Sequence, residues 1–169
     1  MARRDFVYCL VMIIRILDAP DWQLKRDLRL AALQDSPASF GSTFAREKEY
    51  TENDWRSWPR NGAYFAAFDE DQTALGIAGS WINPDAPDTT NLISMWVRPE
   101  ARRCGVAGLL VAAVIAWARR QRSARVELKV ATGNDAALQA YLRNGFRLTD
   151  RKPDDICGAL LELALHDEA

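Results

Sequence analysis

At 169 residues the chain is the size of one domain, long enough for a core that is stable without disulfides or metal ions. Hydrophobic residues make up 49% of it and charged residues 27%, which excludes a disordered or fibrous protein. The 22 lysines and arginines are balanced by 23 acidic residues, so nothing draws the chain generally to nucleic acid or anionic membranes, and any anion site must be local.

The cysteines and the histidine limit the chemistry further. Cys9, Cys104 and Cys157 are odd in number, widely spaced and without a Cys-x-x-Cys pair, which is typical of a reducing compartment and predicts a cytoplasmic protein. The only histidine, His166, lies near the C-terminus. We therefore expect no metal site and no serine–histidine triad within the fold.

The N-terminus resembles a signal peptide only weakly. Basic residues precede the apolar run Phe6–Ile14, but Asp5 interrupts the basic region, Arg15 ends the run early, and no small-x-small cleavage site follows. The run is also too short to span a bilayer. We predict an N-terminal extension at residues 1–12, a single domain at residues 13–169, and no membrane segment.

Hydrophobic periodicity predicts a mixture of strands and helices. An apolar run predicts the first strand at 13–17, and helical spacing predicts two helices, at 20–36 and 44–58. Turn clusters separate three extended segments at 63–68, 75–82 and 91–97, which are typical of an antiparallel meander. A long helix is predicted after Pro99, then a strand at 125–130, a helix from Asn134 to Gly145, and strands at 146–149 and 159–165. This order predicts an α+β domain with a mixed sheet and helices on its faces.

The segment 95–110 is the most informative, because a strand ends there in a basic turn that contains glycine and opens a long helix. The free amide groups of a first helical turn point outward and the helix dipole adds positive potential, so such a turn can hold a pyrophosphate. Gly105 allows close approach of a ligand to the backbone, and Ala107 and Gly108 leave the helix start unobstructed. The turn predicts an anion site.

Two common nucleotide-binding turns do not match this segment. A Walker loop requires Gly-Lys-Ser/Thr, and a dinucleotide fold requires Gly-x-Gly-x-x-Gly after the first strand; the chain has neither. Instead, Arg102-x-x-Gly105-x-Ala107 resembles the Arg/Gln-x-x-Gly-x-Gly/Ala signature of the Gcn5-related N-acetyltransferases. A second segment of that family is similar to Asn134-x-x-Ala137-x-x-x-Tyr141-x-x-x-Gly145-Phe146, one strand further on.

The resemblance extends from about Ile13 to Leu165 and implies the family's fold, a mixed, mostly antiparallel sheet of about seven strands flanked by four helices and splayed between strands 4 and 5. It also implies acetyl-coenzyme A (acetyl-CoA) as cosubstrate. Pantetheine would lie in the gap, and the amides of Met95, Trp96 and Val97 would hold it and polarise the thioester carbonyl. Arg103, where relatives often have glycine, is a departure.

By the same resemblance Tyr141 is the general acid that protonates the departing thiolate, although an aromatic residue on this helix could also simply pack in the core. Asn134 could contact the cofactor or merely cap its helix. Arg102 and Arg103 could reach phosphate oxygens or be solvated. The resemblance implies direct transfer without an acyl-enzyme, which argues against Cys104 as a nucleophile. The expected cofactor-binding residues are Met95, Trp96, Val97, Arg102, Arg103, Cys104, Gly105, Val106, Ala107, Gly108 and Asn134.

The acceptor and the general base are not fixed by the sequence. The predicted strand at 91–97 has no carboxylate, so Asp88, Glu49 or an ordered water could serve as base. Tyr50, Trp55 and Trp58 could line the acceptor pocket or pack in the core. We expect a monomeric or homodimeric N-acetyltransferase acting on a primary amine of a small molecule or protein; the alternatives are a non-catalytic acyl-CoA-binding module and an acyltransferase that uses a longer acyl-CoA.

Overall fold

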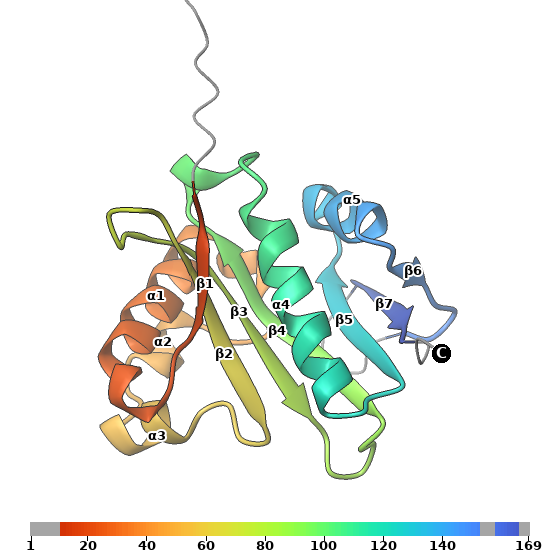
Figure 1. The fold of residues 1–169 in the computed structure, drawn as a ribbon, viewed down its shortest axis with the longest axis horizontal. Helices are drawn as coiled ribbons and strands as arrows, with labels where there is room; N and C mark the ends of the chain where they lie inside the picture. The colour runs from red at the N-terminus through yellow and green to blue at the C-terminus, as the bar shows by residue number, and fades with distance from the viewer. Residues whose placement is uncertain (1–10, 153–157, 166–169) are drawn as a thin grey trace, which may run out of the picture.

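The computed structural model of the protein describes residues 11–152 and 158–165. Residues 1–10 of the expected extension lie outside these ranges, and so do Cys9, Cys157 and His166. The described residues form one seven-stranded sheet with helices on both faces (Figure 1). The predicted fold class is therefore confirmed.

The sheet has the strand order β1-β2-β3-β4-β5-β7-β6. All neighbouring strands are antiparallel except β4 and β5, which are parallel. The strands are β1 (Ile13–Ile16), β2 (Gly62–Phe68), β3 (Ala74–Ile82), β4 (Thr89–Val97), β5 (Arg125–Ala131), β6 (Arg147–Leu148) and β7 (Gly158–Ala164).

The helices differ from the expectation in one place. Where the periodicity predicts a single helix at 44–58, the structure has two short ones, because Thr51 accepts a hydrogen bond from the Asp54 amide and Asp54 accepts one from the Thr51 amide, which starts a new helix. The described part of the chain therefore has five α-helices where four were expected. They are α1 (Trp22–Asp35), α2 (Phe44–Glu47), α3 (Glu52–Ser57), α4 (Val106–Arg120) and α5 (Asp135–Arg143), with 3-10 turns at Ala19–Asp21, Pro37–Ser39 and Pro99–Ala101.

Successive side chains of a strand point to opposite faces of the sheet, and a hydrophobic core lies on each face. On β2, Phe65 packs on the face covered by α4, and the next residue, Ala66, packs on the face covered by α1. Helix α4 crosses one face, and α1 lies on the other (Figure 1). Helix α5 contributes Tyr141 to the core on the α4 side.

The predicted splay between β4 and β5 is present. Only three residue pairs join the two strands, from Thr89–Arg125 to Asn91–Glu127. Beyond them β4 continues to Val97 and β5 to Ala131 without further pairing. The facing edges of the two strands are thus left to bind something other than each other.

Candidate active site

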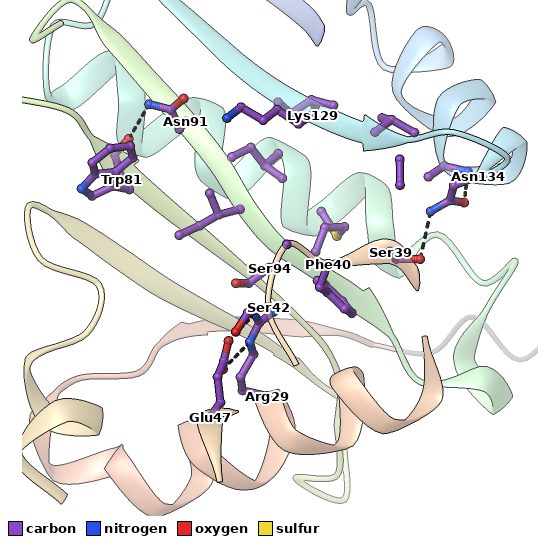
Figure 2. A pocket seen from close by; sticks show the side chains of 18 of the residues that line it. Arg29, Ser39, Phe40, Ser42, Glu47, Trp81, Asn91, Ser94, Lys129 and Asn134 are labelled. Atoms are coloured by element: carbon purple, nitrogen blue, oxygen red, sulfur yellow. Dashed lines mark hydrogen bonds and ion pairs between the residues drawn. The ribbon is translucent and has the colours of Figure 1, made fainter. Parts of the chain in front are cut away.

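A cavity of about 460 Å³ occupies the opening between β4 and β5 (Figure 2). One side is formed by α1, the loop 36–43 and α2, which we call the helical wall. The other side is formed by both strands and α5, so the cavity reaches residues from both faces of the sheet. Its lining comprises Arg29, Ser39, Phe40, Gly41, Ser42, Arg46, Glu47, Tyr50, Trp58, Trp81, Asn91, Leu92, Ile93, Ser94, Met95, Leu128, Lys129, Val130, Ala131, Asn134, Ala137 and Tyr141.

A β-bulge shapes β4 where it borders the cavity. The pairing with β3 shifts after Ile93, and Ser94 has a left-handed backbone with φ of 57°. Since an extra residue reverses the alternation, Leu92 packs on the α4 side whereas Trp96 packs on the α1 side. Ser94 and Met95 line the cavity. Of the three residues predicted to hold pantetheine, Met95 borders the opening, Trp96 is buried against α1, and Val97 ends the strand.

Tyr141 lies on the wall of the cavity and is only 7% exposed. It projects from the last full turn of α5 and meets the ring of Phe146 edge-on, with 5.8 Å between the ring centroids. Burial raises the pKa of the Tyr141 phenol above its ordinary value, because the ionised form would lose its solvation. The phenol therefore keeps its proton well above neutral pH and is suited to donate a hydrogen bond or a proton.

Asn134 is the N-cap of α5 and also lines the cavity. Its side-chain oxygen accepts a hydrogen bond of 3.3 Å from the Ala137 amide, and its amide group donates one of 3.2 Å to the Ser39 hydroxyl (Figure 2). The capping role that the sequence allowed is thus present. The second bond joins α5 to the loop of the helical wall, so Asn134 closes the cavity at this end. Its contact with a cofactor stays a prediction.

The glycine turn before α4 adopts an unusual backbone. Arg103 and Gly105 both have left-handed conformations, with φ of 63° and 84°, and a Cβ atom at Gly105 would meet nothing within 4 Å. Side chains cap the first amides of α2, α3 and α5, whereas α1 and α4 have no side-chain cap, and of these two only α4 is preceded by a glycine turn. Its first amides are therefore available to an anion.

The Arg102 side chain of this turn is bonded to groups on β4 and α1. The Arg102 guanidinium donates to the Val97 carbonyl oxygen at 3.0 Å and forms an ion pair with Asp35, which also accepts a hydrogen bond of 2.8 Å from the Trp96 indole. Trp96 and Arg102 thus fasten β4 and the turn to the end of α1. These contacts lower the pKa of Asp35, with the indole hydrogen bond as the largest cause.

The other predicted residues of the turn differ in exposure. Arg103 and Cys104 are exposed, and the Cys104 thiol contacts the Arg102 carbonyl oxygen at 3.5 Å. The Val106 side chain is buried in the core, so only its backbone faces the turn. Ala107 and Gly108 are half-buried in the first turn of α4. The assignment of this segment to cofactor binding remains a prediction.

Sequence reasoning missed a buried ion pair on the helical wall. Arg29 of α1 donates from Nε to Glu47 Oε2 at 2.8 Å and from Nη2 to Oε1 at 2.7 Å, and both side chains are more than nine-tenths buried. Among the residues the structure describes, Glu47 is the one carboxylate that lines the cavity. The expected base candidates lie elsewhere: Glu49 is exposed, and Asp88 pairs with Arg125 beyond the lining.

A second cavity, of about 490 Å³, adjoins the first and shares Tyr50, Trp58, Trp81 and Ile93 with it. We call it the aromatic cavity. Of the three aromatic residues that the sequence allowed either in the acceptor pocket or in the core, Tyr50 and Trp58 line both cavities, whereas Trp55 is 1% exposed and belongs to the protein interior. The remaining lining residues are Asp54, Ser57, Pro59 and Arg60.

Comparison with known proteins places this geometry in a family. The family model described as "Acetyltransferase (GNAT) family" matches residues 29–146, well over half of the chain. The chain belongs to this acetyltransferase family. The match begins in the middle of α1 and covers the rest of the helical wall, both splayed strands, the glycine turn and α5. A search of curated proteins gave no match.

Solved structures of GNAT proteins share the fold at low sequence identity. A putative acetyltransferase from Salmonella typhimurium, solved with acetyl-CoA, is 17% identical with a TM-score of 0.73 over 94% of this chain and 96% of that one. A GCN5-related N-acetyltransferase from Kribbella flavida is 20% identical, with a TM-score of 0.72 over 91% and 98%. Spermidine N-acetyltransferase from Vibrio cholerae, solved with CoA and spermine, is 13% identical, with a TM-score of 0.70 over 90% and 95%.

Residues 11–152 and 158–165 contain no group of three or more His, Cys, Asp or Glu side chains that could hold a metal ion. No helix in these ranges is long and apolar enough to cross a membrane.

Proposed function

We propose that this protein is an N-acetyltransferase that moves an acetyl group from acetyl-CoA directly to a primary amine. The observation that carries the proposal is the opening between β4 and β5, which has a bulged, unpaired strand edge on one side and the buried phenol of Tyr141 on its wall. Family membership and the cofactors present in related structures support it. When bound, acetyl-CoA supplies the thioester-linked acetyl group.

The residues of this chain fit that cosubstrate at two places. The uncapped first turn of α4, preceded by Gly105, can receive the diphosphate on its amides. The free edge of β4 from Leu92 to Val97 can pair with the extended amide-containing arm, in the way that a further strand would. The two places are joined by the short turn at 98–105, so one extended molecule can occupy both.

Tyr141 is proposed to hold a proton beside the sulfur and to donate it as the thiolate leaves. The raised pKa supports this role, because a phenol that stays protonated at neutral pH is a ready donor. The helical wall faces the strand edge across the opening (Figure 2), and we propose that this wall and the adjoining aromatic cavity hold the acceptor amine. The amine is thereby placed on the opposite side from the diphosphate.

Replacing Tyr141 by phenylalanine tests the proposal. We expect Tyr141→Phe to lower kcat about 100-fold or more, since the loss of a positioned proton donor typically costs that much, while the Kd for CoA changes less than about threefold. Release of free thiol from acetyl-CoA measures turnover against a panel of amines, and calorimetry measures cofactor binding. Unchanged turnover in Tyr141→Phe would remove the residue from the mechanism.

Tyr64→Phe is the matched control for this experiment. Tyr64 is also a buried phenol with a pKa raised by burial, but it lies in the core against α1 and does not line the cavity. Its hydroxyl has no hydrogen-bond partner among the described residues, so its removal leaves no group unsatisfied. Kinetics like those of the wild type are expected. CoA binding without turnover of any amine would indicate a non-catalytic acyl-CoA-binding module instead.

A further inference from the structure

The helical wall contains two buried hydrogen-bond donors that have no partner in the described parts of the chain. They are Nη1 of Arg29, on α1, and the hydroxyl of Ser42, in the loop before α2. Both residues line the cavity. Arg29 is only 6% exposed, and a buried donor without an acceptor is unfavourable in a folded protein.

The other groups of Arg29 are already engaged. Nε and Nη2 are bound to the two oxygens of Glu47, and the guanidinium lies over the ring of Phe40, 4.7 Å from its centroid. These contacts fix the plane of the guanidinium. Nη1 is left without a hydrogen-bond partner among the described residues. In Figure 2 the Arg29 side chain extends from α1 toward Ser42 and the bulge at Ser94. Glu47 acts here as a positioning residue.

The chemistry of these two donors specifies a ligand group. Because Glu47 neutralises Arg29, the site offers two N–H or O–H donors with little net charge. A carbonyl or carboxylate oxygen can accept from both groups, whereas an ammonium group has only donors and cannot bind Nη1 of Arg29. We propose that Arg29 and Ser42 bind an oxygen carried on the carbon next to the acceptor amine, as in an amino acid or an amino-acid amide. This inference rests on the proposed function and names its acceptor class.

The body of such an acceptor has a place in the aromatic cavity, which shares Tyr50, Trp58 and Trp81 with the main one. An apolar or aromatic side chain next to the amine could extend into it. A polyamine fits this environment poorly. Among the described lining residues of the two cavities, the cationic side chains Arg29, Arg46, Arg60 and Lys129 outnumber the carboxylates of Glu47 and Asp54.

Four probes of CoA-saturated wild-type protein test the acceptor class: phenylalanine, phenylalaninamide, 2-phenylethylamine and spermidine. The first three share one aromatic body and differ only in the oxygen group. We expect phenylalanine or its amide, or both, to bind about tenfold or more tightly than 2-phenylethylamine by calorimetry, and kcat/KM to follow the same order. Comparison of the acid with the amide distinguishes a carboxylate from a carbonyl ligand.

Two variants assign the preference to the two donors. The first is Arg29→Met/Glu47→Met, which removes both charges together, and the second is Ser42→Ala. In each we expect the preference for phenylalanine or its amide over 2-phenylethylamine, expressed as the ratio of their affinities, to fall about fivefold or more. The affinity for 2-phenylethylamine itself should stay within about twofold of the wild-type value. Thr73→Ala is the control, since Thr73 is exposed in the turn between β2 and β3 and lines neither cavity. Thermal unfolding verifies that each variant is folded.

The proposal would be overturned if 2-phenylethylamine bound as tightly as the other two aromatic probes, if the preference persisted in both variants, if spermidine were the best acceptor, or if none of the four bound. Acetylation of 2-phenylethylamine or spermidine in such a case would leave the acetyltransferase proposal intact. Failure of acetyl-CoA itself to bind would contradict both proposals.

Discussion

Gly105→Glu is expected to abolish CoA binding while the protein stays folded. A Cβ atom at this position meets no neighbour, so the new side chain has room, although the φ of 84° makes a non-glycine residue cost about 1–2 kcal/mol. The carboxylate would lie at the first turn of α4, where the diphosphate is proposed to bind. At about 4 Å a like charge costs about 4 kcal/mol near a protein surface, which corresponds to about a 1000-fold loss of affinity.

Gly105→Gln separates charge from backbone strain in this experiment. Glutamine has the same shape and the same backbone cost, but no charge to repel a phosphate. We expect its Kd for CoA, measured by calorimetry, to rise about tenfold at most, and both variants to unfold at similar temperatures. Equal affinities of Gly105→Glu and the wild-type protein would show that the diphosphate binds elsewhere, and the assignment of the glycine turn would be lost.

Arg29→Met is expected to cost about 3–5 kcal/mol of unfolding free energy. The substitution leaves the Glu47 carboxylate buried on the helical wall without its bidentate partner, and an uncompensated buried charge is among the most destabilising defects in a protein. Urea denaturation at pH 7 measures the loss. Arg26→Met on the same helix is the control, because its pair with Asp27 is exposed and contributes about 1 kcal/mol at most.

The double variant Arg29→Met/Glu47→Met should recover most of this stability. With both charges replaced by apolar side chains of similar volume, no unpaired ion remains, and such replacements are often neutral or stabilising. Stability of the double variant near that of the wild type, together with a lost acceptor preference, would indicate that the ion pair is retained for binding. A stable single variant would contradict the burial of the pair.

Much of the fold could be predicted because its signals are local. Periodicity places the strands and the long helix within a few residues, and Asn134 and Gly145 mark the two ends of α5 as expected. The split between α2 and α3 also has a local signal, the Thr51-x-x-Asp54 pattern, which the helical spacing of the apolar residues obscured.

The missed features depend on contacts between distant segments. The bulge at Ser94 follows from the pairing of β4 with β3, and no residue type in the strand predicts it. Arg29 and Glu47 are 18 residues apart on different helices, and each alone is indistinguishable from a solvated charge. Arg102 illustrates the same limit, because only the folded chain brings Asp35 to it.

The cavity draws its two sides from separate stretches of the chain. Residues 29–58 supply the helical wall and much of the aromatic cavity, whereas β4, the glycine turn and α5 supply the side proposed for the cofactor. Exchanges in the first stretch that leave the contacts of Asp35 and Ser39 with the other side intact are therefore expected to change the acceptor without moving the residues proposed to bind the acetyl donor. Such modularity gives one scaffold a route to many acceptors.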